Sequence, residues 1–277
     1  MSMMGLYESV IDKIAVAAPP MQSGDYMGED GLMYCGKCRT RRQTRVDVLG
    51  TIRTVPVMCQ CMIEAREAEQ AREKAARIER ARRISLMEEA DAACTFENDD
   101  RKNPVVSDAM RRYADGFRKM WEKNIGLLLY GPVGTGKSFF AACVANALLE
   151  QEVSVKMTNF TRIINDMQAI FEGRQEYLNG LNRNNLLIID DLGVERESEY
   201  MQEQVYNIID ARYRAGRPLI VTTNIPLEEI KNPKNMQRQR IYDRVLELCH
   251  PVKIDGTSRR RRAVIDHYAE RNRLLGI

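Results

Sequence analysis

The stretch Gly131-Pro132-Val133-Gly134-Thr135-Gly136-Lys137-Ser138 has the pattern G-x-x-x-x-G-K-S of a phosphate-binding loop. An apolar run at 125–130 precedes it and predicts a buried strand, and the Ala-rich pattern at 139–149 predicts a helix. The glycines allow the loop amides to face a phosphate chain, and the positive end of the helix dipole attracts the same anion. Strand, loop and helix therefore follow one another in the order that nucleotide binding requires.

Individual residues of this loop have separate predicted roles. Lys137 is expected to reach the β- and γ-phosphates of ATP, and the hydroxyl of Ser138 is expected to hold Mg²⁺. The predicted nucleotide-binding residues are Gly131, Pro132, Val133, Gly134, Thr135, Gly136, Lys137, Ser138 and Phe139. A chance glycine-rich turn is the alternative, and the flanking strand and helix patterns argue against it.

A second apolar run, at 186–189, ends in two carboxylates, Asp190 and Asp191. Asp190 fits the aspartate that holds Mg²⁺ in phosphate-loop ATPases, and Asp191 follows where it would polarise the attacking water. A further predicted strand at 219–223 ends in Asn224, whose amide would sense the γ-phosphate or orient that water. These residues extend the predicted site beyond the phosphate loop.

Strand and helix patterns alternate along the second half of the chain, which predicts an α/β fold with a parallel sheet covered by helices. A helix is expected at 107–122, capped by Ser107 and packed on the sheet through Phe117, Met120 and Trp121. The polar stretch at 173–185 predicts a loop. Its arginines and tyrosine would line a channel for single-stranded DNA, or the loop is simply solvated.

Composition limits the possible functions. The chain has 277 residues, of which 44% are hydrophobic, so one large domain and a smaller module are expected. Its net charge of +3 argues neither for nor against a nucleic-acid partner. No apolar run has membrane-spanning length and no signal-peptide pattern is present, which favours a cytoplasmic protein. The seven cysteines then indicate metal ligation or core packing rather than disulfides.

Two close pairs of cysteines predict a structural zinc site near the N-terminus. The pairs have the spacings C-x-x-C and C-x-C, and between them lie two alternating runs, 44–48 and 51–57, with a turn at Leu49-Gly50. Four thiolates joined by a hairpin suit tetrahedral Zn²⁺. The predicted ligands are Cys35, Cys38, Cys59 and Cys61. The alternatives are four unrelated thiols or a redox dithiol. The basic residues around the cysteines would contact nucleic acid or an acidic partner, or they are simply solvated.

The stretch 62–87 is rich in Ala, Glu, Arg and Lys with a thin apolar stripe, which predicts a long helix. It is expected to be a solvated linker, with a partner-binding helix as the alternative. The predicted organisation is an N-terminal module at 1–61 with the four cysteines, a charged linker helix at 62–93 and an ATPase domain at 94–277.

Four motifs together resemble those of AAA+ ATPases: the phosphate loop at 131–138, L-L-I-I-D-D at 186–191, T-T-N at 222–224 and D-R at 243–244. More narrowly, the chain resembles the DnaC/DnaI helicase loaders and the related IstB transposition helpers, roughly from Cys94 onward. Its paired Asp190-Asp191 matches this group, and its N-terminal cysteine module resembles the zinc-binding domain of DnaI-type loaders.

The resemblance implies an AAA+ core with a reduced lid and assigns roles to further residues. Asn224 would be sensor 1, and Arg244 would be an arginine finger that acts across a subunit boundary. Arg260 fits sensor 2, but Arg259 stands where the family has an aromatic residue, so the choice among residues 259–262 stays open.

The function implied by the resemblance is ATP-dependent loading of a hexameric replicative helicase onto single-stranded DNA, with self-association through the ATPase domain. Its cofactors would be ATP, Mg²⁺ and Zn²⁺. The alternatives are an IstB-like ATPase that helps DNA transposition and an ATP-controlled, zinc-containing nucleic-acid-binding regulator. The N-terminal cysteine module on a charged helix favours the loader.

Overall fold

The computed structural model describes residues 21–170, 172–193, 199–233, 235–256, 258, 268 and 271–277. The chain divides into two compact units, Met1–Arg77 and Ile78–Ile277, and the division falls inside helix α2 (Gln60–Ser85). The arginine run at 259–262, which includes the predicted sensor Arg260, lies outside the described residues.

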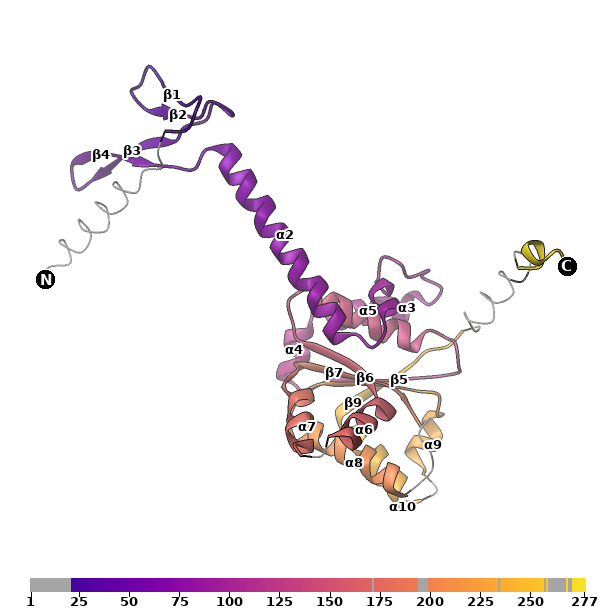
Figure 1. The fold of residues 1–277 in the computed structure, drawn as a ribbon. Coiled ribbons are helices and arrows are strands. Elements are labelled where there is room, and N and C mark those ends of the chain that lie inside the picture. The colour runs from indigo at the N-terminus through magenta and orange to yellow at the C-terminus, as the bar shows by residue number, and fades with distance from the viewer. Residues whose placement is uncertain are drawn as a thin grey trace, which may run out of the picture. The chain divides into compact units, whose positions relative to one another are not determined.

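The first unit contains two small antiparallel sheets and the first part of α2 (Figure 1). β1 (Tyr26–Met27) pairs with β2 (Met33–Tyr34), and β3 (Gln43–Val48) pairs with β4 (Thr51–Pro56). Leu49 and Gly50 both have positive φ, 55° and 82°, the backbone that a two-residue hairpin turn requires. The predicted hairpin and its turn are therefore confirmed.

Helix α2 is a single helix of 26 residues, and all but one of its side chains are at least partly exposed. Its composition of alanines and opposite charges accounts for a helix with little packing, because such residues have high helix propensity. Among the described residues, no helix has both the length and the apolar character needed to cross a membrane.

The second unit is built on a five-stranded parallel sheet in the order β6-β7-β8-β5-β9. The predicted parallel sheet is thus confirmed, with the phosphate-loop strand between two neighbours. The strands are β5 (Gly126–Tyr130), β6 (Val155–Asn159), β7 (Leu186–Leu192), β8 (Leu219–Thr223) and β9 (Cys249–Lys253).

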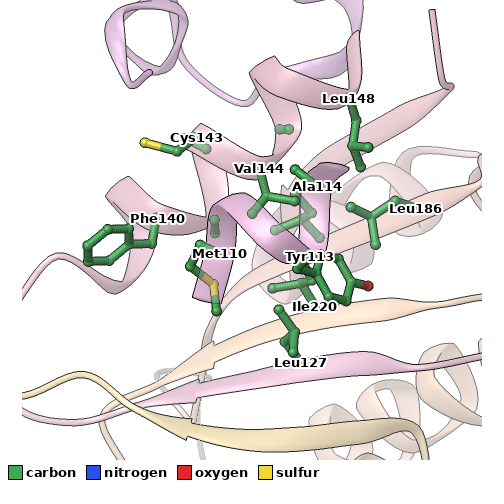
Figure 2. Packing of buried hydrophobic residues seen from close by; sticks show 14 of the residues in the cluster. Met110, Tyr113, Ala114, Leu127, Phe140, Cys143, Val144, Leu148, Leu186 and Ile220 are labelled. Carbon is green, nitrogen blue, oxygen red and sulfur yellow. The ribbon is translucent and has the colours of Figure 1, made fainter. Parts of the chain in front are cut away.

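Helices cover both faces of this sheet, as expected for strands that are apolar throughout. Leu127 and Leu129 pack on the face covered by α3 and α5, while Leu128 between them packs on the opposite face with α6, α8 and α10. Figure 2 shows side chains of α3 and α5 meeting the sheet at Leu127 and Ile220. The helical elements are η1 (Glu89–Ala93), α3 (Pro104–Asp115), α4 (Phe117–Glu122), α5 (Lys137–Glu150), α6 (Phe160–Ala169), α7 (Arg174–Arg183), α8 (Glu199–Arg214), α9 (Leu227–Lys231) and α10 (Met236–Leu248).

The helix predicted at 107–122 is wrong in its start and its continuity. It begins earlier, where Asn103 rather than Ser107 caps α3, and it is interrupted at Gly116 before α4. Ser107 is instead a buried residue whose hydroxyl donates to Asp99. Trp121, expected to pack on the sheet, lies on α4 beyond this break and is 41% exposed.

The loop predicted at 173–185 is also wrong, because most of it forms helix α7. Leu178 and Leu181 are buried in the apolar cluster on the sheet face that α6, α8 and α10 cover. They form the buried face of this otherwise polar helix. Tyr177 donates a hydrogen bond to Asp166 at 2.7 Å, and Arg183 pairs with Glu176. Arg174 donates to the carbonyl of Ile170 at 3.4 Å, so all three side chains expected to contact DNA have partners within their own chain.

Candidate nucleotide and metal sites

The phosphate loop joins the end of β5 to the start of α5, at the edge of the sheet where parallel strands commonly form ligand sites. Gly131 has φ 149°, and a Cβ atom there would lie 2.2 Å from the carbonyl oxygen of Ile254. Gly136 has φ 103° and is the N-cap of α5. Glycine is thus required at both ends of the loop, and the amides at the start of α5 are available for an anion.

Lys137 lies at the centre of the site and is 5% exposed. Its ammonium donates to the carbonyls of Gly131 and Pro132, at 3.0 and 2.8 Å, and to the amide oxygen of Asn224, at 2.7 Å. Two sequence-predicted residues from different strand ends, Lys137 and Asn224, are therefore in direct contact. Because phosphate oxygens are stronger acceptors than neutral carbonyls, a bound nucleotide would compete for this ammonium.

A cavity of about 200 Å³ lies above the loop. This volume is below the roughly 300 Å³ at which pockets for whole small molecules begin, so it fits phosphate groups rather than a complete nucleotide. Its lining comprises Val133, Gly134, Gly136, Lys137, Ser138, Phe139, Asp191 and Asn224. Eight residues predicted for nucleotide chemistry from three separate segments thus share one cavity.

The two carboxylates at the end of β7 occupy different surroundings. Asp191 lines the cavity, whereas Asp190 is 5% exposed and does not line it. The register between β7 and β8 shifts between Ile189 and Leu192, and Asp191 has φ 59°. Irregular strand ends of this kind re-aim side chains near sites, which accounts for the separation of two consecutive aspartates.

Thr222 is a site residue whose role the sequence reasoning missed. Its hydroxyl donates to Asp190 at 2.5 Å and accepts from the backbone amide of Asp191 at 2.9 Å. A single buried hydroxyl thereby fixes both consecutive carboxylate residues. The T-T-N pattern contained Thr222, but only the pairing of β7 with β8 reveals what it contacts.

Arg244, the predicted arginine finger, is on α10 and does not line the phosphate cavity of its own chain. Its guanidinium pairs with Glu247 at 2.7 Å and with Asp210 of α8 at 3.4 Å, and it lies 4.2 Å from the ring centroid of Tyr213. The hydrogen bond to Glu247 is the main cause that raises its pKa above the ordinary value. Arg244 therefore has in-chain partners that any action in trans would have to replace.

The four predicted zinc ligands come together in the first unit. Their sulfur atoms all lie within 4.8 Å of one another, with Cys59 and Cys61 at 3.4 Å and Cys35 and Cys61 at 3.7 Å. Tetrahedral Zn²⁺ with bonds of about 2.3 Å would place its sulfurs about 3.8 Å apart. The donor set and its spacing therefore fit Zn²⁺.

The four thiols differ in how easily they ionise without a metal. A hydrogen bond with Thr40 is the main cause that lowers the pKa of Cys38 to about 5, while contact with Cys59 is the main cause that raises the pKa of Cys61 to about 12. Close thiolates repel one another, so one is stabilised at the expense of its neighbours. A divalent cation would allow all four to ionise together.

A buried ion pair supports the first pair of cysteines. Arg42, 1% exposed, donates to Asp25, which also accepts from the backbone amides of Gln22 and Gly36. Gly36 lies between Cys35 and Cys38, and a Cβ atom on it would overlap the carbonyl of Gly24. Arg42 is one of the basic residues near the cysteines that were expected to contact nucleic acid, an acidic partner or solvent, and the sequence did not indicate this structural role.

Comparison with known proteins agrees with this geometry. A family model described as IstB-like ATP binding protein matches residues 63–266. The replicative helicase loader DnaI of Bacillus subtilis (strain 168) is 26% identical over 181 residues, which are 60% of this chain and 58% of DnaI. A Mycobacterium tuberculosis protein named as ATP-binding protein Rv3427c in insertion sequence is 28% identical over 206 residues, covering 71% of this chain and 79% of that protein.

The fold is shared with a solved structure as well. The crystal structure of DnaI has a TM-score of 0.54 and 23% sequence identity, covering 65% of this chain and 99% of that one. The AAA+ fold predicted from the motifs is thereby confirmed, while this chain spans only 58% of the full-length loader that it matches. Because the family model extends over well more than half of the sequence, the chain belongs to the family of IstB-like ATP-binding proteins.

Proposed function

We propose that this protein is an ATP-driven loader that places a ring-shaped replicative helicase onto single-stranded DNA in the cytoplasm. The observation that carries the proposal is the combination, in one chain that is similar to the loader DnaI over 181 residues, of a phosphate-loop cavity with a separate four-cysteine unit. The ATPase unit would contact DNA and other copies of itself, and the cysteine unit with its helix would grip the helicase.

The proposed ATP hydrolysis assigns roles to residues that line the cavity and to others outside its lining. The ammonium of Lys137 would bind the β- and γ-phosphates, and Ser138 and Asp190 would hold Mg²⁺, which neutralises phosphate charge when bound. Asp191, which lines the cavity, would polarise the attacking water, and Asn224 would orient it. Arg260 would act as sensor 2 on the bound phosphates.

Two variants test these roles. Lys137→Ala removes the phosphate counter-charge, so nucleotide binding measured by fluorescence anisotropy should fall by roughly two orders of magnitude or more. Asp191→Asn should keep nucleotide affinity and lose turnover in a phosphate-release assay. Lys253→Ala, on the surface of β9, is a matched control that should change neither. Wild-type turnover in Asp191→Asn would exclude it as the group that polarises water.

Arg244 is proposed to complete the site of a neighbouring subunit, where a cation supplied in trans is worth orders of magnitude in rate. Inactive Arg244→Ala protein mixed with inactive Lys137→Ala protein should then recover part of the activity, since an intact loop can meet an intact arginine. No recovery in assemblies shown by light scattering to contain both variants would contradict this role. In that case Arg244 would have a structural role within its own chain, through its ion pairs with Asp210 and Glu247.

Zn²⁺ is proposed to hold the cysteine unit together through Cys35, Cys38, Cys59 and Cys61. The close approach of the four sulfurs supports it. Protein purified without chelators should contain one equivalent of zinc by mass spectrometry of metals, and a Cys35→Ser, Cys59→Ser variant should contain none. A metal-free wild type whose cysteine unit remains protected from hydrogen exchange would contradict the proposal.

The alternative is an ATPase that helps DNA transposition and binds duplex DNA. The insertion-sequence relative favours it, because this chain covers 79% of that protein. A third possibility is a zinc-containing nucleic-acid-binding regulator whose assembly ATP controls. The three functions share the ATPase unit, so they differ in their partners and in the form of DNA that they prefer.

The deciding experiment uses the full-length protein with the hexameric replicative helicase of the same source. A loader should co-migrate with the helicase in gel filtration without DNA, and should transfer it to closed circular single-stranded DNA only with ATP. Its own binding to single strands should weaken with salt, because arginine–phosphate contacts release counterions. Lys137→Ala is the matched control for the ATP step. Preference for duplex DNA without helicase association would favour transposition.

A further inference from the structure

Thr40 contacts both halves of the four-cysteine site, although it is not itself a ligand. Its hydroxyl oxygen lies 3.1 Å from the sulfur of Cys38 and accepts the backbone amide of Gln60 at 2.9 Å. Gln60 separates the two cysteines of the second pair, Cys59 and Cys61. The same threonine accepts the amide of Cys35 with its backbone carbonyl, at 2.9 Å.

The direction of these hydrogen bonds follows from the chemistry of the groups. A backbone amide only donates, so the Thr40 oxygen must be the acceptor toward Gln60. The single hydroxyl proton is then available for Cys38, whose sulfur accepts it when it is a thiolate. Two hydrogen bonds through Thr40 therefore connect the backbone of Gln60, in the second cysteine pair, to the sulfur of Cys38 in the first pair.

Cys38 is more exposed to solvent than Cys35 and Cys59, so a hydrogen bond to its sulfur has a larger effect on its reactivity. Cys35 and Cys59 are 5% and 1% exposed, whereas Cys38 is only partly buried and lies where water and reagents reach it. A charge-assisted hydrogen bond withdraws electron density from a thiolate, which lowers its basicity and its reactivity toward electrophiles. Groups that hydrogen-bond to metal ligands also fix the orientation of those ligands.

We propose that Thr40 is a positioning residue of the metal site, which holds the two cysteine pairs at the spacing that Zn²⁺ requires and protects Cys38 from attack. The proposal rests on the zinc site proposed above. It predicts that loss of the hydroxyl loosens the metal while all four ligands remain. Because outer groups of this kind typically change metal affinity by about 10- to 100-fold, the expected effect is in that range.

The test compares three full-length variants loaded with Zn²⁺. Thr40→Val keeps the shape of the side chain and removes the hydroxyl, and Thr40→Ser keeps the hydroxyl. Thr54→Val makes the same change at an exposed threonine of β4, for which the structure records no side-chain hydrogen bond among the described residues. Zinc affinity is measured by competition with the chelator 4-(2-pyridylazo)resorcinol, and the rate of zinc release is measured after addition of N-ethylmaleimide.

Thr40→Val should bind zinc about 10- to 100-fold more weakly and release it faster on alkylation, while Thr40→Ser and Thr54→Val should resemble the wild type. Substitution of Co²⁺ gives a second readout, because loss of the hydrogen bond to Cys38 should shift the thiolate-to-cobalt charge-transfer absorption. Should Thr40→Val fail to fold even with excess zinc, folding of Thr40→Ser would support the role of the hydroxyl.

Two results would overturn the proposal: a Thr40→Val protein equal to wild type in affinity, release rate and spectrum, or a Thr40→Ser protein as weak as Thr40→Val. Neither result would affect the zinc site itself. That site fails separately, if the wild-type protein takes up no zinc under conditions in which its second unit binds ATP.

Discussion

The two units of the chain maintain their sites by different means. Behind the phosphate loop, two clusters of buried apolar side chains cover the faces of the sheet, and α5 is buried along almost its whole length. In the described residues of the first unit, the only buried hydrophobic side chains are Leu32, Cys35 and Cys59. One site is therefore supported by a large apolar core, whereas the other has few buried apolar side chains around its ligands and polar contacts.

The same contrast appears in Arg42 and Arg212, the two most deeply buried arginines in the described part of the chain. Arg42 of the first unit is neutralised by the carboxylate of Asp25, and its partner also holds the backbone beside the cysteines. Arg212 of the second unit is fully buried and donates instead to backbone carbonyls, including those of Asn184 and Pro218 at its shortest contacts. Arg212 thereby joins the segments that precede β7 and β8, whereas Arg42 forms a buried polar contact in a unit with few buried apolar side chains.

Removal of zinc should have the largest effect and should separate the two units. Structural zinc contributes roughly 10–16 kcal/mol in small metal-dependent domains, more than a unit of this size can replace by apolar burial. After treatment with a strong chelator, hydrogen exchange should show loss of protection in β3 and β4 with none in β5 and α5. The measurement is mass spectrometry of the full-length protein with and without chelator.

Readdition of Zn²⁺ should restore the protection, and this is the control for irreversible oxidation of the cysteines. Equal loss in both units would mean that they unfold together and that the contrast in their packing has no thermodynamic consequence.

Breaking the buried ion pair should have the next largest effect. Arg42→Met leaves the carboxylate of Asp25 beside Gly36 without its counter-charge, and removal of one partner of such a pair is destabilising. Exchange protection of the zinc-loaded first unit should fall accordingly. Asp25→Asn combined with Arg42→Met should recover part of the loss, because no charge is then left unpaired. A single variant as stable as the double would show that Arg42 contributes packing alone.

Within the second unit, the strands and the loop that form the site were predictable from sequence, whereas some of the surrounding helices were not. Buried parallel strands are continuous apolar runs, and the phosphate loop has a fixed spacing, so β5, β7 and residues 131–138 follow directly from local pattern. Helix α7 escaped prediction because only Leu178 and Leu181 mark its buried face among asparagines, arginines and a glycine. The break at Gly116 escaped because the residues on both sides favour a helix.

The residues that hold the site residues in place could not be predicted from local sequence pattern. The cysteine spacing gave the four ligands, since a metal imposes its spacing on the sequence. Thr40, Arg42 and Thr222 act through partners that only the folded chain brings near, and their residue types are common at exposed positions. Sequence therefore identifies groups that meet a ligand more readily than groups that hold those groups in place.

Thr222→Val should have a smaller effect, limited to catalysis. It removes the hydroxyl that binds Asp190 and the amide of Asp191, while the apolar isostere still fits between the strands. We expect kcat to fall about 10-fold, equivalent to about 1.4 kcal/mol of transition-state stabilisation, with nucleotide affinity nearly unchanged. Thr222→Ser should restore the rate. Loss of nucleotide binding in Thr222→Val would indicate that the hydroxyl shapes the cavity rather than the carboxylates.

The smallest effect is expected for a large apolar residue in the first unit. Ile52 of β4 is 70% exposed, whereas Leu128 of β5 is fully buried between β8 and β9. Truncation of each to alanine removes a similar side chain, but only at Leu128 does it leave a cavity, which typically costs about 2–5 kcal/mol. Ile52→Ala should change stability by no more than about 0.5 kcal/mol, since its side chain is already in water. Hydrogen-exchange protection of each unit in the zinc-loaded protein measures the stability change of both variants. A loss above about 1 kcal/mol for Ile52→Ala would mean that the side chain of Ile52 packs against other residues in solution. The first unit would then have a larger apolar core than its described residues form.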